Sequence, residues 1–131
     1  MANREIYHKF VVKELSFVNR ELNDQSFKLK PLFSKKITKL NDNEYEVALK
    51  VEIKNTVENP FPFDLVAIVA LVTKFVGEVS KEELDEYLNK TSVSIIFPYL
   101  RSSVTSLTSA GLMTPLVLPV IDVRNFEANQ E

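Results

Sequence analysis

The side chains that could do acid–base or nucleophilic chemistry are few and scattered along the chain. The sequence has no cysteine and a single histidine, His8, between Tyr7 and Lys9. A lone histidine there is typical of a solvated surface residue, so we expect neither serine–histidine catalysis nor a histidine-rich metal site. With only Gly77 and Gly111, the chain also lacks the glycines of a phosphate-binding loop. We therefore predict no catalytic residue, no metal and no cofactor.

Three acidic residues are the remaining candidates for an enzyme. Asp64, Glu78 and Asp122 could act on a thioester if a sheet wrapped around a helix brought them together, as in thioesterases of the hot-dog type. Nothing in their spacing places them around a base or an oxyanion-binding turn. Strand-end capping and turn formation are the alternative roles of Asp64 and Asp122. Turnover of an acyl thioester would decide for the enzyme.

The composition is that of an ordinary globular domain. The 131 residues are 45% hydrophobic and 26% charged, with a formal net charge of -2, which suits a single domain over residues 1–131. This charge supplies no general attraction for nucleic acid or anionic lipid. The longest apolar run, residues 65–72, is far shorter than the roughly 20 residues of a membrane span. The N-terminus does not resemble a signal peptide, and the absence of cysteine suits a reducing compartment. We expect a soluble, cytoplasmic protein.

A basic stretch raises the alternative of a nucleic-acid-binding module. The segment from Lys28 to Lys39 contains five lysines and no acidic residue, and such a segment can contact phosphates. Only Phe27 and Phe33 accompany it as aromatic residues, so no stacking platform is evident. We interpret the stretch as a solvated edge and predict no nucleic-acid partner. Binding to single-stranded RNA at physiological salt would revive the alternative.

The first half of the chain shows two extended segments. Residues 10–17 are predicted to form a strand, with Val11, Leu15 and Phe17 on one face. Residues 27–33 form a second extended stretch, and the proline within it confines that stretch to a sheet edge or a crossover.

Two stronger strand patterns follow a segment, residues 37–40, that we expect to re-enter the sheet. Residues 45–53 alternate between apolar and charged side chains, which predicts one buried and one solvated face. Residues 63–72 are apolar on both faces, which suits a strand covered on both sides. Because the neighbouring strand has a charged face, we expect the second face to be left partly uncovered for a helix, another subunit or a client.

The second half begins with a well-marked helix start. Ser80 and Glu83 match the capping box, and Val79 and Leu84 occupy the positions of a hydrophobic staple. Farther along, apolar residues recur at helical spacing: Ile96, Leu100, Val104 and Leu107. Gly111 is placed to end that helix.

The long helix has two further features. Pro98 either begins it as a first-turn residue or bends a longer helix that starts near Thr91. Ser103, Ser106 and Ala110 form a stripe of small side chains that would let another helix or a sheet approach closely. The stripe is either a self-association surface or the polar side of a core helix. After it, Leu112 and Met113 lie in an extended, proline-containing segment, where they either contact a partner or cap the core.

These segments carry a resemblance to a known family. "IIFPYLRSSVTSLTSAG" followed by "PLVLPV" resembles the signature of the SecB protein-export chaperones. "YEVALKVEI" is similar to the third strand of that family and "KELSF" to its first. The resemblance extends, with gaps, from about Phe10 to Phe126.

The resemblance implies an α+β fold, in which a four-stranded antiparallel sheet with a crossover is backed by a long bent helix. It implies homodimers, built by strand and helix contacts, that pair into a tetramer, a dimer of dimers. It implies an ATP-independent holdase, not an enzyme, that keeps unfolded polypeptides in apolar grooves, for export or, alternatively, for an antitoxin or other dedicated client without SecA. The candidate client-binding residues are Phe61, Phe63, Val66, Ile68, Leu112 and Met113, and the candidate oligomer interface is Ser103, Ser106 and Ala110.

The match to the family's SecA-docking surface is incomplete. The first acidic position of that surface corresponds to Glu14, whereas the second falls on Val18 and the one in the fourth strand falls on Ile68. The residues after Phe126 are also too few to supply the family's second helix. Holding of unfolded protein is therefore better supported than delivery to SecA.

Overall fold

The chain folds into one antiparallel sheet and one long helical run. The structure is a computed structural model, and it describes residues 5–22, 27–111 and 113–118. The elements are β1 (Glu5–Asn19), β2 (Leu32–Asn41), β3 (Glu44–Ile53), β4 (Phe63–Val76), α1 (Lys81–Glu86), the π-helical turn η1 (Tyr87–Thr91) and α2 (Ser92–Ala110). The strands lie in the order β1-β4-β3-β2, so the connection after β1 crosses from one edge of the sheet to the other. The predicted α+β fold, with four antiparallel strands and a crossover, is confirmed.

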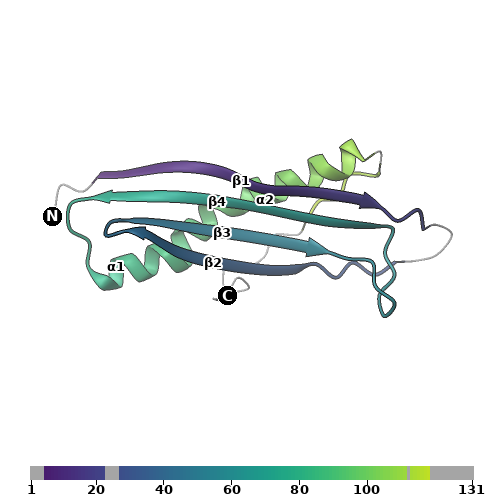
Figure 1. The fold of residues 1–131 in the computed structure, drawn as a ribbon, viewed down its shortest axis with the longest axis horizontal. Helices are drawn as coiled ribbons and strands as arrows, with labels where there is room; N and C mark the ends of the chain where they lie inside the picture. The colour runs from purple at the N-terminus through teal and green to yellow at the C-terminus, as the bar shows by residue number, and fades with distance from the viewer. Residues whose placement is uncertain (1–4, 23–26, 112, 119–131) are drawn as a thin grey trace.

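The sheet and α2 form two layers. In Figure 1, α2 runs diagonally behind the sheet and covers one side of it, here called the helix face; the other side is the outer face. Apolar residues alternate along β3 and β4 so that every second side chain points toward α2 and is buried, as a period of two requires. The fully buried side chains at this contact include Leu49, Val51, Leu65 and Leu71 of the sheet and Val93, Ile96, Leu100 and Val104 of the helix.

An irregularity in β1 changes which residues share a face. Val12 pairs with Val69, but Glu14 pairs with Ile68, so one extra residue bulges between them. A bulge of one residue transfers the following side chains to the opposite face. The prediction that Val11 shares a face with Leu15 and Phe17 is therefore wrong: Val11 pairs with Ala70 on the outer face, whereas the other two lie on the helix face.

The helical run begins as predicted. The Ser80 hydroxyl accepts a hydrogen bond from the Glu83 backbone N–H at 3.1 Å, and the Glu83 carboxylate accepts one from the Ser80 N–H at 3.1 Å. Pro98 lies inside α2, so the alternative in which Pro98 starts the helix is wrong. The longer helical run is correct, and the π-helical turn joins α1 to α2 within it.

Gly111 ends α2 for a reason that the sequence did not show. Its backbone N–H donates to the Leu107 carbonyl, as a helix cap does. Its φ of −80° is open to any residue, so no left-handed conformation requires glycine there. A Cβ on Gly111 would lie 2.5 Å from Cε1 of Phe17. Close approach of the helix end to β1 is the requirement, and glycine meets it because it has no side chain.

Candidate functional site

An exposed row of apolar side chains runs along β1. Ile6, Phe10, Val12 and Leu15 pair across the sheet with buried helix-face residues of β4 and so point toward the side of α2. They remain 41%, 42%, 58% and 46% exposed. We call these four residues the β1 row. No strand formed by the described residues lies beyond β1, so its outer backbone groups border the row as an open sheet edge.

Aromatic rings continue the β1 row toward the crossover. Phe17 of β1 lies 5.2 Å, centroid to centroid, from Phe63, which lies 5.0 Å from Phe61, and Phe61 lies 5.9 Å from Phe27. We call these four residues the aromatic cluster. Phe61 and Phe63 are buried, whereas Phe17 and Phe27 are only partly buried against the core. Aromatic pairs prefer offset and edge-to-face contacts of this kind, and the two partly buried rings leave apolar surface at this end of β1.

The six predicted client-binding residues do not form one surface. Phe61 and Phe63 lie in the aromatic cluster on the helix face. Val66 and Ile68 lie on the outer face, opposite Ser16 and Glu14 of β1, because neighbouring residues of a strand alternate between faces.

The remaining two predicted client-binding residues come after Gly111. Leu112 lies outside the described residues, and Met113 packs, partly buried, against the core. The prediction thus names residues on two sides of the sheet, and the β1 row was not among them.

The small-residue stripe of α2 faces away from the sheet. Ser106 and Ala110 are exposed and Ser103 is partly buried, with its hydroxyl donating to the Tyr99 carbonyl at 2.9 Å. Tyr99 is 53% exposed and its ring lies 4.6 Å from that of Phe10. Apolar surface of α2 and the β1 row therefore meet along one side of the molecule.

A short extended segment, residues 113–118, returns along α2. Side chains of the helix bind its backbone: the Thr108 hydroxyl accepts from the Leu116 N–H at 2.9 Å, and the Thr105 hydroxyl donates to the Leu116 carbonyl at 2.8 Å. Arg101 Nε donates to the Leu118 carbonyl at 3.0 Å. The segment is thus held on α2 through its main chain.

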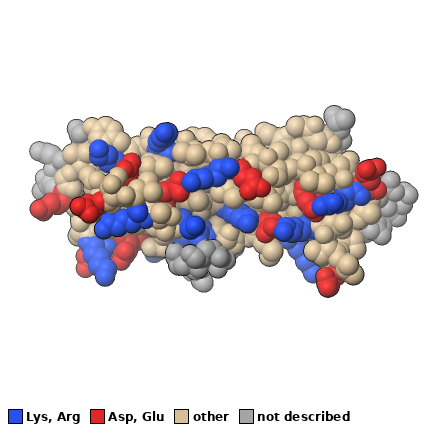
Figure 2. All heavy atoms as spheres, in the orientation of Figure 1, with Lys and Arg blue, Asp and Glu red and all other residues tan. Residues whose placement is uncertain are grey.

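Charged side chains of both signs are spread over the outer face (Figure 2). In Figure 2, which looks onto this face, basic and acidic groups alternate over the strands. Lys13 reaches over β4 to Glu46, with 2.9 Å between Nζ and Oε2, and partly covers the apolar residues of β4. The expectation of a second β4 face that is only partly covered is met by Val66, Ile68 and Val72, which are intermediate in burial.

Asp64, one of the carboxylates considered for an enzyme, is held in polar contacts. Arg20 Nε donates to its Oδ2 at 3.0 Å, and the Asn55 backbone N–H donates to its Oδ1 at 2.8 Å. The hydrogen bond from Arg20 is the main cause of a lowered Asp64 pKa; the Asn55 hydrogen bond and the charge of Lys54 lower the pKa further, against the opposing effect of burial. A carboxylate paired in this way is a poor base. The predicted role of strand-end capping describes its contacts, since Asp64 is the second residue of β4.

The other acidic candidates are not brought into a site with Asp64. Glu78 follows the end of β4, at the opposite end of that strand, and Asp122 lies outside the described residues. Within the described part of the chain, no group of three or more histidine, aspartate or glutamate residues is placed to hold a metal ion. None of the helices in that part is long and apolar enough to span a membrane.

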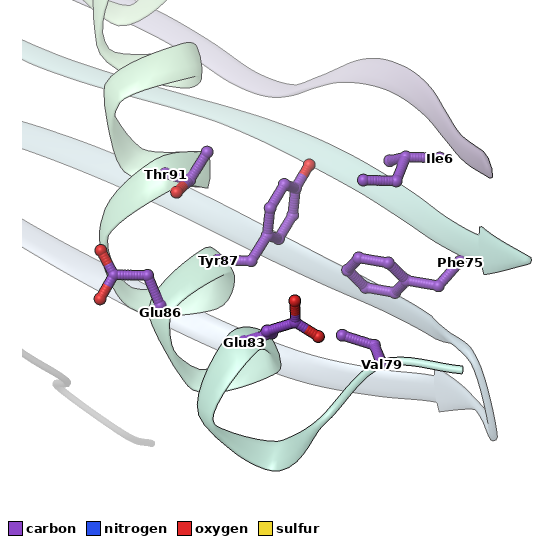
Figure 3. A pocket seen from close by; sticks show the side chains of 7 residues that line it. All are labelled: Ile6, Phe75, Val79, Glu83, Glu86, Tyr87 and Thr91. Carbon is purple, nitrogen blue, oxygen red and sulfur yellow. The ribbon is translucent and has the colours of Figure 1, made fainter. Parts of the chain in front are cut away.

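A small cavity lies at the start of β1, beside α1 and η1. Its volume is about 200 Å³, and Figure 3 shows Tyr87 at its centre, with Ile6 and Phe75 on one side. The Tyr87 hydroxyl lies 2.7 Å from Nε2 of His8 and 3.0 Å from the Thr73 hydroxyl. Burial raises the pKa of Tyr87, and the Thr73 hydrogen bond opposes that shift. His8 therefore takes part in a structural contact between β1 and η1.

Lys35 departs from the interpretation of the basic stretch as a solvated edge. It is 3% exposed, on the helix face of β2, and its Nζ donates to Oδ1 of Asn89 in η1 at 3.0 Å. Burial lowers its pKa. Lys28 and Lys36 are exposed, as expected.

Comparison with known proteins identifies the family. The family model described as preprotein translocase subunit SecB matches residues 3–130, which is nearly the whole chain. The chain belongs to the SecB family. It is therefore related to chaperones of protein export, and SecB homologues are chaperones and not enzymes. The resemblance found in the "FPYLR" helix and the strands is confirmed.

Individual relatives support the same assignment. The protein-export protein SecB of Orientia tsutsugamushi strain Boryong is 31% identical over 127 residues, covering 92% of this chain and 79% of the relative. The SecB of Xanthomonas euvesicatoria is 32% identical over 127 residues, covering 92% and 71%. A solved SecB-like chaperone of Mycobacterium tuberculosis, in complex with a peptide from an antitoxin, has a TM-score of 0.74 at 16% identity and covers 91% of both chains. This last likeness shows that the fold is that of SecB.

Two structural features of this SecB chain, the β1 row and the attachment of residues 113–118 to α2, were missed from the sequence. The alternation of Ile6, Phe10 and Val12 is a recognisable strand pattern, but the bulge that follows puts Leu15 out of phase with it. The hydroxyl and guanidinium groups that hold residues 113–118 recur at helical spacing along α2, a signal that only the position of that segment makes meaningful.

Proposed function

We propose that this SecB chain is a holdase that binds non-native polypeptides without ATP, and that the β1 row and the aromatic cluster form the apolar surface shared by its sister subunits and its clients. The observation that carries the proposal is the β1 row, in which four large apolar side chains are 41–58% exposed beside an open sheet edge. Contiguous apolar surface of this kind is typical of an interaction site. Membership of an export-chaperone family supports polypeptides as the ligands.

We divide this surface between sister subunits and clients. An open edge strand can pair with a second β1, and the outward side of α2, with Ser103, Ser106 and Ala110, can pack against another helix. These two contacts would build the expected dimer and then the tetramer. The aromatic cluster, at the other end of β1 beside the crossover, is left for clients.

The binding energy of such a site needs no deep pocket. An unfolded segment gains roughly 25 cal/mol for each Å² of apolar area that it buries, so several contacts along the aromatic cluster can offset the ordering of the client. Folding of the client buries the same groups and so competes with binding. Release then requires no nucleotide.

The direct test is suppression of aggregation. The purified protein should prevent aggregation of a chemically denatured, slow-folding protein near one tetramer per client, with no nucleotide added. Phe27→Ser should weaken client binding roughly tenfold, because it removes an aromatic contact, while Lys28→Ser, the exposed neighbour, should leave binding unchanged. Unaltered aggregation at several-fold excess of the wild-type chain would refute the proposal.

The subunit contacts have a separate test. Val12→Lys on β1 and Ser106→Trp on α2 should each lower the mass measured by light scattering, whereas Glu82→Trp, at an exposed position of α1, should not. Equal masses for all variants would remove the proposed interfaces without touching client binding.

Delivery to SecA has weaker support than holding. On the outer face, Glu14 pairs with Ile68, and Val18 pairs with Asp64, so apolar residues stand at two of the positions expected to be acidic. A dedicated client is the alternative, and the antitoxin peptide bound by the Mycobacterium tuberculosis relative is an example in another protein. Calorimetric titration with SecA decides: binding that Glu14→Lys abolishes supports export delivery, and no binding supports the dedicated client.

We propose that the protein acts in the cytoplasm, where unfolded export substrates and antitoxins are first exposed. Cell fractionation tests this location. Acyl-thioester turnover and RNA binding remain the distant alternatives, and both can be assayed on the same purified protein.

A further inference from the structure

We propose that the track on α2 which holds residues 113–118 is itself a binding site for an extended apolar segment of a client, and that residues 113–118 occupy it when no client is bound. The inference rests on the proposed holdase function. It adds a second client site to the aromatic cluster and a competition between the client and the chain's own segment.

The track recognises main chain, which makes its specificity broad. Thr108, Thr105 and Arg101, here called the staple residues, lie three and four residues apart and so on one side of α2. Their side chains bind the N–H and C=O of Leu116 and the C=O of Leu118. Every peptide other than at proline offers the same groups, so any extended segment can make these three hydrogen bonds.

The bound segment also shows which side chains the track accepts. Leu118 is fully buried in the main core, Leu116 is partly buried, and Val117 between them is 64% exposed. This alternation is that of an extended peptide that inserts every second side chain into a receiving surface. The fitting client is therefore an uncharged extended stretch with large aliphatic residues two positions apart.

Residues 113–118 are held in a way that allows replacement. They are not part of the sheet or of a helix, and Pro115 has no N–H to donate. Apart from the staple hydrogen bonds, the backbone of Met113 donates to the Thr108 carbonyl at the end of α2. When a client segment replaces residues 113–118, its backbone N–H and C=O groups can bind the same side chains of α2. No hydrogen-bonding group of these side chains is then left without a partner.

The test uses two substitutions that should change client affinity in opposite directions: one weakens the binding of residues 113–118, and the other weakens the track. Leu118→Ala weakens the internal occupant but leaves the staple residues intact, so it should raise the affinity for a client about threefold to tenfold, because the competing state is less populated. Thr105→Val, added to Leu118→Ala, removes a staple hydrogen bond and should reverse most of that gain. Val117→Ala, at the exposed position between the two leucines, is the control and should change nothing.

The probe is a fluorescent synthetic peptide with the sequence Met-Thr-Pro-Leu-Val-Leu, measured by anisotropy, together with a denatured model protein. Hydrogen exchange gives a second readout that a folding defect does not imitate. Saturation with the denatured protein should speed exchange at the Leu116 amide of the wild-type chain, which donates to Thr108, while the amides of α2 stay protected. If the Leu118→Ala variant unfolds, Leu118→Val should also raise the affinity for the client, by a smaller factor.

Each outcome is informative. Unchanged affinity in a folded Leu118→Ala variant, together with unchanged exchange at the Leu116 amide under saturating client, overturns the proposed track and leaves the proposed holdase function intact. A wild-type chain that binds no denatured protein at all would instead refute the proposed function itself.

Discussion

Substitution of Gly111 by alanine tests whether the close contact between the end of α2 and β1 is what demands glycine. The added Cβ would lie 2.5 Å and 2.6 Å from Cε1 and Cζ of Phe17, whereas carbon atoms in contact are ordinarily about 3.5–4.0 Å apart. The ring of Phe17 would have to move by about 1 Å, and it already packs against Phe63 at 5.2 Å between centroids. The substitution therefore disturbs the aromatic cluster directly.

The expected size follows from two opposing effects. Overpacking costs about 1–3 kcal/mol, and alanine recovers about 0.4–1 kcal/mol by restricting the unfolded chain, since the φ of Gly111 suits any residue. Gly111→Ala should therefore lower the free energy of unfolding by about 1–2 kcal/mol. In a Phe17→Ala background the obstruction is gone, and the same change should raise the free energy of unfolding by about 0.5 kcal/mol.

The assay is urea unfolding followed by far-ultraviolet circular dichroism, because the chain has no tryptophan. Protein concentration must be held constant, since self-association contributes to apparent stability. With a slope of about 1–3 kcal/mol per molar urea, the wild-type background should show a midpoint lower by about 0.3–2 M. The reasoning is refuted if Gly111→Ala has the same effect in both backgrounds, because then Phe17 is not the obstruction.

Three further predictions concern stability. Because Arg20 lowers the pKa of Asp64, the stabilisation by this carboxylate is present above its ordinary pKa of 3.8 and is lost as the pH falls below that value. Asp64→Asn should therefore lower the free energy of unfolding at pH 7 and make it depend less on pH in the acid range. Lys35→Met should raise the free energy of unfolding at pH 7 by about 1 kcal/mol, since a buried ammonium is replaced by an apolar chain of similar length, and a lower urea midpoint would contradict this. Ser80→Ala should lower thermal stability by about 1 kcal/mol through loss of the helix cap, with Lys81→Ala, at the adjacent exposed position, as the control in the same calorimetric scan.

Elements whose residues interact locally were predictable. The strand of residues 45–53 follows from alternation, and the helix start from the Ser80 and Glu83 capping box, because each signal lies within a few residues. The apolar character of both faces of β4 also indicated a strand that is covered on both sides, and the second face is indeed only partly exposed. The family assignment followed from the sequence for the same reason, since its motif lies within one helix and the segment after it.

Contacts between distant segments were decided only in three dimensions. The bulge after Val12 sets which side of β1 is apolar, and it depends on pairing with β4 more than fifty residues away. Lys35 looked solvated because its partner, Asn89, follows on a different element.

The sequence by itself determined the family and most of the strands and helices, since these depend on residue type and local period. The tertiary structure alone decided where apolar surface remains uncovered. Burial is a property of what lies opposite a side chain, so Phe61 and Phe63 became core while the β1 row stayed 41–58% exposed. It also decided that position 111 must be glycine, because the Phe17 ring leaves no room for a side chain there. The packing of residues 113–118 on α2 was decided in the same way, since no local sequence pattern connects the two segments.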